Sequence, residues 1–325
     1  MSYIKGVCLI GLVSVHVLVC AAQERTVRPL SAPVAAQSAG PGPLSRSVPL
    51  GNGRHLSISC LGTGSPTVVL EAGLDWGGSW SWMTLLPEVA RFTRVCAYDR
   101  AGSGFSDPGP VPRDGKHIVS DLHMLLGAAG EKPPYVLVGQ SLGGALVRLY
   151  RLRYPADVNA MVLVDPSQPG PNEWRKPWVT KFRSCEKLAR HGAISAATTD
   201  CMPPGGLADR PAVVVQAIVQ IAQRPGTWRD QLSEIEHFDS YFEQLETGEH
   251  PPVATPTIVL TASEQGGLDQ KARTDWIAGH ARIAALYIPG EQRLIVKSSH
   301  GIQLDRPEVI VQAIRDVLRE ANDHP

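Results

Sequence analysis

Short apolar segments that alternate with helical stretches dominate the chain from residue 45 onward. Most of these segments lack polar–apolar alternation, and such continuous runs are typical of strands covered on both faces of a parallel sheet. The apolar runs are residues 66–71, 94–98, 135–138, 161–164 and 257–260, and residues 55–60 form an alternating strand. Helices are predicted at residues 80–91, 117–129, 142–153 and 307–321, the last with Asp305 as its N-cap. This order predicts an α/β fold with a doubly wound, mostly parallel central sheet and helices on both faces.

One long segment, residues 168–250, interrupts this alternation between two core strands. It contains no strong strand pattern, several Trp and Pro residues, and helical stretches such as 212–223. An insertion of this length at this place predicts a helical lid over a site.

The size and charge of the chain restrict its partners. Its 325 residues, 43% of them hydrophobic, can bury one large core, so we expect a single domain at residues 45–325 that includes the insertion. The chain has 31 basic and 31 acidic residues and a formal net charge of +0. That balance builds neither the positive field that nucleic acids require nor a polybasic membrane patch. A small-molecule substrate fits best, and the oligomeric state is not determined by the sequence.

The first 22 residues have the layout of a secretory signal peptide. Lys5 precedes an apolar run over residues 6–19, and the small residues Cys20, Ala21 and Ala22 follow. Cleavage before Ala22 or Gln23 would give a secreted or periplasmic protein without an integral membrane span. A lipoprotein anchored at Cys20 ranks second and an uncleaved anchor third. Residues 23–44 are rich in Ala, Pro, Ser and Gly and are predicted to be a disordered linker.

Export makes disulfides possible among the four cysteines outside the signal peptide. Cys185 and Cys201 lie close together in the insertion, and we predict that they form a disulfide. Cys60 and Cys96 lie at or near predicted strands, where a second disulfide and buried free thiols are both open.

The segment Gly139-Gln-Ser-Leu-Gly143 is the strongest chemical signal in the chain. It follows the apolar run 135–138 and opens the helix predicted at 142–153. A G-x-S-x-G sequence between a strand and a helix is the pattern of a nucleophile elbow, in which the serine takes strained backbone angles. The pattern predicts Ser141 as a nucleophile and the backbone N–H of Leu142 as an oxyanion donor.

With this elbow, the chain resembles serine α/β-hydrolases of the esterase type. Three further segments match: Val68-Val-Leu-Glu-Ala-Gly-Leu74, Ala97-Tyr-Asp-Arg-Ala-Gly-Ser-Gly-Phe-Ser-Asp107 and Ser298-Ser-His-Gly-Ile-Gln-Leu-Asp-Arg-Pro307. The resemblance implies the α/β-hydrolase fold, Leu74 as the second oxyanion donor and His300 as the general base. It also implies that Asp99 and Arg100 form a structural ion pair.

The acid of the triad is open between three residues. The family usually carries an Asp after the strand that follows the lid, but Gln265 stands near that position here, with Glu264 and Asp269 as neighbours. Haloalkane dehalogenases, which share the fold, can carry their acid one strand earlier, where this chain has Asp165. Because of Gln265, we favour Asp165 over Glu264.

These residues together predict a serine hydrolase that cleaves a small carboxylic ester through an acyl-enzyme intermediate. Ser141 at the elbow is inconsistent with dehalogenase or epoxide hydrolase chemistry, which uses an Asp there. A lactonase, a catalytically inactive binding protein and an aminopeptidase remain alternatives; the last needs an acidic anchor, for which the candidates are Glu173, Asp230 and Glu234. No pair of histidines has metal-ligand spacing, so we predict neither a metal nor another cofactor.

Overall fold

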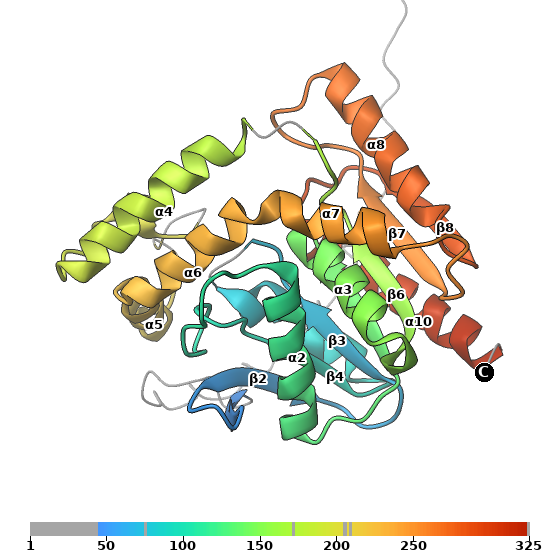
Figure 1. Ribbon diagram of the computed structural model, residues 1–325, viewed down its shortest axis with the longest axis horizontal. Coiled ribbons are helices and arrows are strands. Elements are labelled where there is room, and N and C mark those ends of the chain that lie inside the picture. Colours follow the sequence, from blue (N-terminus) through green and yellow to red (C-terminus); the bar gives the residue numbers. More distant parts are fainter. Residues whose placement is uncertain (1–44, 75–76, 171–172, 204–206, 208–209, 324–325) are drawn as a thin grey trace, which may run out of the picture. The chain divides into compact units, whose positions relative to one another are not determined.

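The computed structural model describes residues 45–74, 77–170, 173–203, 207 and 210–323 (Figure 1). The chain divides into two units, residues 1–36 and 37–325, and every described residue belongs to the second. The predicted signal peptide and the linker of residues 23–44 lie outside the described residues. No helix in the described ranges is long and apolar enough to cross a membrane.

The central sheet has eight strands in the order β1-β2-β4-β3-β5-β6-β7-β8. β1 and β2 pair antiparallel, β2 is antiparallel to β4, and the remaining neighbours are parallel. The strands are β1 Ser45–Pro49, β2 His55–Leu61, β3 Thr67–Glu71, β4 Val95–Tyr98, β5 Tyr135–Gln140, β6 Val158–Val164, β7 Thr257–Ala262 and β8 Gly290–Ile295. The predicted mostly parallel sheet is confirmed, and β1 and β8 are strands that the sequence pattern missed.

Helices cover both faces of the sheet (Figure 1). One face packs against α2 (Gly115–Ala129), α3 (Leu142–Arg153), α7 (Phe238–Gly248) and α8 (Gln270–Ala284). The other packs against α1 (Leu86–Val89) and α10 (Pro307–Asp323). Along β5, Tyr135 and Leu137 enter the first core whereas Val136 and Val138 enter the second. This division explains the continuous apolar runs, because successive side chains of a strand point to opposite faces and both are buried.

Two expectations about helices need correction. The helix predicted at residues 80–91 is a 3-10 helix, η1 (Gly78–Trp82), followed by the single-turn helix α1 (Leu86–Val89), which has Pro87 in its first turn. Proline cannot continue a helix from the preceding turn because it lacks an N–H and clashes with the carbonyl four residues earlier. Asp305 is not the N-cap of α10: it ends the short helix α9 (Ile302–Asp305), and its carboxylate accepts hydrogen bonds from the N–H and hydroxyl of Ser299.

The insertion between β6 and β7 contains four helices and the 3-10 helix η3 (Thr199–Cys201). Its first three helices, α4 (Arg175–Arg190), α5 (Ala212–Ala222) and α6 (Pro225–Glu236), share a separate apolar core, against which Leu74, Trp80 and Phe105 of the main domain also pack. α7 joins the core of the sheet instead. The predicted disulfide between Cys185 and Cys201 is confirmed and ties η3 to α4.

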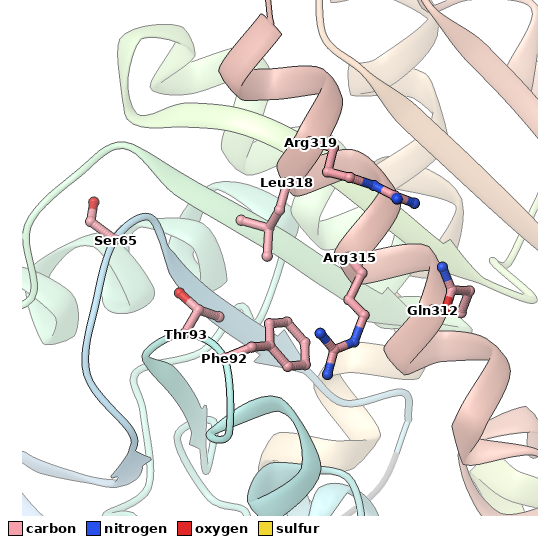
Figure 2. A pocket seen from close by; sticks show the side chains of 7 residues that line it. All are labelled: Ser65, Phe92, Thr93, Gln312, Arg315, Leu318 and Arg319. Carbon is pink, nitrogen blue, oxygen red and sulfur yellow. The ribbon is translucent and has the colours of Figure 1, made fainter.

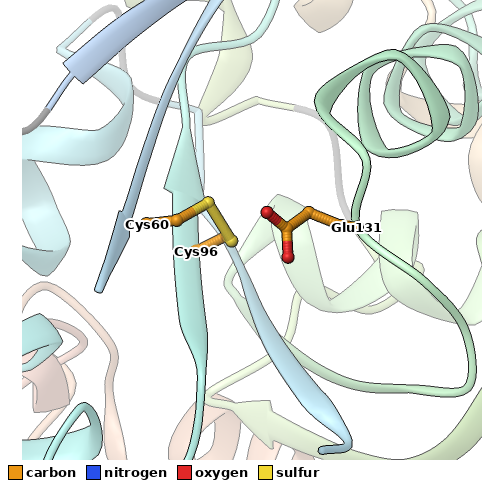
Figure 3. Close-up of side chains that lie close together, drawn as sticks. All are labelled: Cys60, Cys96 and Glu131. Carbon is orange, nitrogen blue, oxygen red and sulfur yellow. A yellow bond between two sulfur atoms is a disulfide. The ribbon is translucent and has the colours of Figure 1, made fainter. Parts of the chain in front are cut away.

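The second pair of cysteines also forms a disulfide. Cys60 on β2 and Cys96 on β4 are directly opposite each other in the antiparallel register, and their sulfur atoms are bonded (Figure 3). The register of the two strands therefore decides a pairing that the sequence left open.

Candidate active site

Ser141 lies at the sharp turn between β5 and α3. Its backbone has φ 53° and ψ −120°, a conformation that costs a residue with a side chain about 1–3 kcal/mol. The turn needs glycine nearby: Gly143 packs against the end of β3, and a Cβ atom there would clash with the carbonyl oxygen of Glu71. The Ser141 N–H donates to the carbonyl of Val164 on β6 at 3.0 Å. The surrounding sheet thus holds a strained serine with its Oγ directed away from the core.

His300 stands beside this serine, in the loop between β8 and α9. Its Nε2 lies 2.9 Å from Ser141 Oγ. Two hydrogen bonds hold the loop. Gln140 Nε2 donates to the His300 carbonyl at 3.1 Å, and the N–H of the preceding residue, Ser299, donates to Asp305. The His300 side chain is 42% exposed, so one edge of the ring is open to solvent and to a substrate.

Asp165, directly after β6, is the third member of a hydrogen-bonded series that begins with Ser141 and His300. Its Oδ2 lies 2.6 Å from His300 Nδ1, and its side chain is fully buried. Like Ser141, it has a positive φ, 43°. Ser167, two residues on, donates its N–H to the carbonyl of Ser141 at 2.9 Å, and the hydroxyl oxygens of Ser167 and Ser141 are 3.3 Å apart. The segment that carries the acid and the one that carries the serine are therefore joined by backbone hydrogen bonds.

Every acceptor site of the Asp165 carboxylate is occupied. Oδ1 accepts from the N–H of Ala262 at 2.9 Å and from Trp276 Nε1 at 3.0 Å. Oδ2 accepts from His300 and also from Gln265 Nε2. Burial alone would raise the pKa of Asp165, but the hydrogen bond and charge of His300 outweigh it and the pKa is lowered. Asp165 is therefore a carboxylate at neutral pH and orients His300 with Nδ1 protonated and Nε2 facing the serine.

The two alternative acids do not join this series. Glu264 is exposed, and its backbone N–H donates to the carbonyl of Ser298. Asp269 is the N-cap of α8 and accepts from the N–H of Ala272. Gln265 does contact the series, because its Nε2 donates to Asp165 Oδ2; the same Nε2 lies 3.1 Å from the protonated His300 Nδ1, where neither nitrogen can accept. The residue near the expected position of the acid thus donates a hydrogen bond to Asp165.

The two predicted oxyanion donors flank the serine. Leu142 begins α3 directly after Ser141, and a first-turn N–H of a helix has no acceptor within the helix. Leu74 follows the end of β3, immediately before residues 75–76, which lie outside the described ranges. The neighbouring Gly73 contacts the serine closely, since a Cβ atom placed on it would lie 3.1 Å from Ser141 Cβ. Both N–H groups therefore come from segments next to the nucleophile.

His280 and Trp276 are parts of the site that the sequence did not single out. Both lie on α8, more than 100 residues from Asp165, and no local motif marks them. His280 is fully buried; Nε2 lies 2.8 Å from the carbonyl of Pro166, and Nδ1 lies 3.0 Å from Thr261 Oγ1. A carbonyl can only accept, so Nε2 carries the proton and Nδ1 accepts from the threonine. His280 is thus a neutral imidazole that supports the acid-bearing segment.

This burial predicts a pH dependence of stability. Burial lowers the pKa of His280 below its ordinary value of about 6.5, whereas the nearby Asp165 charge acts in the opposite direction and His300 adds to the lowering. The unfolded chain therefore binds more protons at this residue, and the free energy of unfolding should fall as the pH drops below about 6.5. The lowered pKa of Asp165 affects the free energy of unfolding only near and below about pH 4, so the effects of Asp165 and His280 fall in separate pH ranges. His280→Gln should reduce the loss of thermal midpoint between pH 7 and 5.5, and an unchanged loss would contradict this origin.

The predicted ion pair between Asp99 and Arg100 is wrong. Asp99 accepts from the backbone N–H groups of Ser79 and Phe105, and Arg100 pairs with Glu71 and Glu234. Adjacent residues at the end of a strand point to opposite sides of the sheet. Asp99 and Arg100 therefore meet different partners and do not pair with each other.

These contacts also bear on the candidate anchors of an aminopeptidase. Asp230 is buried and accepts from Arg229 and from the N–H of Gly109, and Glu234 is neutralised by Arg100. Glu173 is exposed just before α4. The two buried carboxylates therefore have basic partners within the protein.

A cluster of possible metal ligands lies elsewhere in the domain. Cys60, Cys96 and Glu131 are close together (Figure 3), but the two sulfur atoms are bonded to each other and offer no thiolate. Glu131 accepts from Arg94 at 2.7 Å. The disulfide form of this cluster is therefore not a metal centre.

A surface cavity of about 430 Å³ is also separate from the serine. It lies between α10 and the residues that follow α1 (Figure 2), and Arg315 stacks on the Phe92 ring at 3.7 Å from its centroid. Its lining residues are Ser65, Phe92, Thr93, Gln312, Arg315, Leu318 and Arg319. None of them belongs to the series of Ser141, His300 and Asp165.

Comparison with known proteins agrees with the fold. A family model described as the alpha/beta hydrolase fold matches residues 66–186. The uncharacterized protein YqjL of Bacillus subtilis is 35% identical over 106 residues, which are 33% of this chain and 42% of that protein. The 2-hydroxy-6-oxo-2,4-heptadienoate hydrolase of Pseudomonas putida is 32% identical over 117 residues, 35% of this chain and 42% of that enzyme. The chain thus matches less than half of the length of these curated relatives.

Solved structures match over a larger part of the chain. The enol-lactonase from Burkholderia xenovorans has a TM-score of 0.62 and 19% identity, covering 85% of this chain and 99% of its own. The meta-cleavage product hydrolase from Pseudomonas fluorescens has a TM-score of 0.59 and 18% identity, covering 86% and 98%. At these identities the likeness concerns the fold. With the family model over residues 66–186 and the strand order, it shows that the described part of the chain has the α/β-hydrolase fold.

Proposed function

We propose that this protein is a serine hydrolase that cleaves a small carboxylic ester through an acyl-enzyme intermediate. The observation that carries the proposal is the hydrogen-bonded series from Ser141 Oγ through both nitrogens of His300 to the buried Asp165. A serine, an imidazole and a carboxylate in this order are the components of nucleophilic acyl transfer, whatever their order in the chain.

The proposed acylation step uses these three side chains. His300 Nε2 accepts the Ser141 hydroxyl proton as Oγ attacks the substrate carbonyl carbon, and the resulting imidazolium is stabilised by the Asp165 carboxylate through Nδ1–H. The carbonyl oxygen becomes an oxyanion that accepts from the N–H groups of Leu142 and Leu74. His300 then gives its proton to the leaving alcohol as the tetrahedral intermediate collapses to the acyl-enzyme.

Deacylation uses the same groups on a water molecule. His300 Nε2 removes a proton from the water, whose oxygen attacks the acyl carbon, and Ser141 Oγ leaves and regains its proton. General base catalysis by a positioned imidazole supplies about 10²–10⁴-fold and each oxyanion donor about 10²–10³-fold. The helical insertion over residues 168–250 is proposed as the lid that shapes the substrate pocket.

The choice of an ester as substrate rests on the intact serine and on the chemistry of the relatives. Those with named activities include an enol-lactonase and a putative carbamate hydrolase from Klebsiella pneumoniae, 35% identical over 104 residues. Both names denote acyl-group hydrolysis. A lactone is a cyclic ester, so lactones belong in the same substrate screen as open-chain esters.

Hydrolysis of p-nitrophenyl esters from acetyl to decanoyl tests the proposal. We expect turnover whose optimum chain length reports the size of the pocket, and we expect Ser141→Ala to lower kcat by at least about 10³-fold because the nucleophile is lost. Ser195→Ala, which changes an exposed loop serine, is the matched control and should retain wild-type turnover.

Labelling with a fluorophosphonate separates the alternatives. An active serine hydrolase should be labelled at Ser141 with one equivalent and lose its esterase activity. A folded protein that hydrolyses none of the esters and resists the label would contradict the proposal and favour a catalytically inactive binding protein.

A further inference from the structure

Arg100 is a fully enclosed charge next to the predicted oxyanion segment. Its side chain is 2% exposed, and it lies just after β4, in the segment that leads to α2. Nη1 donates to Glu71 Oε1 at 2.7 Å and to the carbonyl of Ala72 at 2.6 Å. Nη2 donates to the carbonyl of Gly73 at 2.5 Å. One guanidinium therefore binds three successive residues at the end of β3.

The same guanidinium also binds the helical insertion. Nε and Nη2 donate to the two carboxylate oxygens of Glu234 on α6, at 3.1 and 2.9 Å. Glu234 is fully buried, and Tyr241 Oη on α7 donates to its backbone carbonyl at 3.0 Å. Arg100 thus makes two hydrogen bonds to the insertion and three to the main domain. These contacts use the rigid, planar set of donors of a guanidinium, which lysine lacks.

The contacts with the main-chain carbonyls set the direction of the following N–H groups. In a trans peptide the carbonyl and the N–H of the next residue point in opposite directions. With the carbonyl of Gly73 bound to Arg100, the N–H of Leu74 points away from the guanidinium. Gly73 itself lies against the nucleophile, 3.1 Å from Ser141 Cβ to the place where its own Cβ would be. Rotation of the Gly73–Leu74 peptide would turn the N–H of Leu74 toward Arg100 and break the Nη2 hydrogen bond.

The charges around Arg100 make this clamp depend on both carboxylates. Burial raises the pKa of Glu71, and the charge and hydrogen bond of Arg100 oppose that rise. Tyr98 Oη donates a second hydrogen bond to Glu71. Removing the Glu234 charge would weaken the hydrogen bonds from Nε and Nη2 to α6, and the attraction of Glu71 would then draw the guanidinium away from the Gly73 carbonyl.

We propose that Arg100 is a positioning residue that holds the N–H of Leu74 in its oxyanion-binding direction and, through Glu234, makes that direction depend on the docking of α6. The role rests on the proposed serine hydrolase function. It links the insertion to catalysis: when α6 is in place, the guanidinium is fully bound and the oxyanion site is complete. When α6 moves away, the Arg100 guanidinium loses the two hydrogen bonds to Glu234 and keeps the three to Glu71, Ala72 and Gly73.

The test uses Glu234→Gln in the full-length protein, since this change keeps the shape of the side chain and removes its charge. Glu236→Gln is the matched control, because it makes the same change on the same helix in an exposed ion pair with Arg183. Concentrations of active protein are set by titration with a fluorophosphonate, so that partial unfolding does not appear as a lower kcat. We expect Glu234→Gln to lower kcat per titrated site by about 10- to 100-fold, with KM within about twofold.

An alkyl boronic acid supplies a readout that a purely structural role would not move. It forms a tetrahedral adduct with the serine whose oxygen occupies the oxyanion site, so its affinity should fall in parallel with kcat. Arg100→Lys keeps the charge but not the fork and should show a loss of about 10²-fold or more in both quantities. If Arg100→Lys does not fold, Glu234→Gln still decides the outcome.

The outcomes separate this proposal from the function on which it rests. If the wild-type protein hydrolyses no ester and resists the fluorophosphonate, the hydrolase function and the positioning role both fall. If the wild type is active but folded Glu234→Gln retains wild-type kcat and boronate affinity, the positioning role alone is wrong. A rise in KM at unchanged kcat would also overturn it, because a substrate-binding role for α6 would then explain the effect.

Discussion

Replacing Asp165 with asparagine is expected to lower kcat by about 10³–10⁴-fold while the protein remains folded. The asparagine oxygen can still accept from the N–H of Ala262 and from Trp276, which leaves its amide nitrogen facing His300 Nδ1. Two donors cannot share a hydrogen bond, so the imidazole shifts its proton to Nε2 and can no longer accept the proton of Ser141. The measurement is kcat on the best p-nitrophenyl ester, with circular dichroism as the check on folding.

Two other acidic residues provide matched controls for this variant. Glu264→Gln changes an exposed side chain, and Asp269→Asn retains a residue that caps a helix equally well. Both should keep wild-type kcat. A large loss in Glu264→Gln together with a small one in Asp165→Asn would show that the acid is at the end of β7 instead.

The position of Gln265 allows a stricter test of the same assignment. Its Nε2 lies 3.1 Å from His300 Nδ1, so Gln265→Glu would place a carboxylate oxygen within hydrogen-bonding reach of the imidazole. The double variant Asp165→Asn/Gln265→Glu should therefore recover about tenfold or more of the activity lost in Asp165→Asn. Asp165→Asn/Gln265→Ala, which adds no carboxylate, should recover none. Equal activity of the two double variants would mean that residue 265 does not reach the imidazole productively.

Replacing Arg148 with methionine is expected to reduce the free energy of unfolding by about 3–5 kcal/mol. Arg148 on α3 donates to Glu249 Oε2 at 2.5 Å and to Tyr287 Oη at 3.2 Å, and the side chains of Arg148 and Glu249 are 7% and 4% exposed. The variant would leave the Glu249 carboxylate buried with only the Tyr287 hydroxyl as partner. Urea denaturation followed by tryptophan fluorescence measures the loss.

The size of this effect depends on the unpaired charge rather than on the lost ion pair. Arg190→Met removes an exposed pair with Glu186 on α4 and should cost no more than about 0.5 kcal/mol. Combining Arg148→Met with Glu249→Leu and Tyr287→Phe removes all three polar groups together, and stability should return to near the wild-type value. A triple variant as unstable as Arg148→Met would show that packing, not the buried charge, causes the loss.

Most of the sheet could be predicted from the sequence because its central strands are buried on both faces. β3, β5, β6 and β7 are continuous apolar runs for that reason, and the ends of each were predicted to within three residues. β8 was missed because it is an edge strand with three exposed or half-buried polar residues, Glu291, Gln292 and Arg293, and only its pairing with β7 defines it. Residues 80–91 were predicted as one helix, whereas the structure has η1 and then the separate helix α1, with Pro87 in its first turn.

The site was predictable where a local pattern carries the chemistry. The elbow at Ser141 and the loop that carries His300 are short motifs, and each is defined by residues that are close together in the sequence. The acid has no such motif, and Asp165 and Glu264 each end a strand of the same parallel sheet. Gln265, Trp276 and His280 reach Asp165 or its supporting carbonyl from positions 100 or more residues away, so no spacing in the sequence indicates them.

The sequence by itself determined the layered α/β fold, the strained serine and its histidine, and the disulfide of Cys185 with Cys201. These depend on periodicity, on turn chemistry or on the closure of a short loop, all of which act over a few residues. Only the tertiary structure decided the bond between Cys60 and Cys96, the hydrogen bonds that fill Asp165, and the position of Arg100 between Glu71 and Glu234. Each of these follows from the register in which distant strands and helices meet, and register depends on the packing of the whole core.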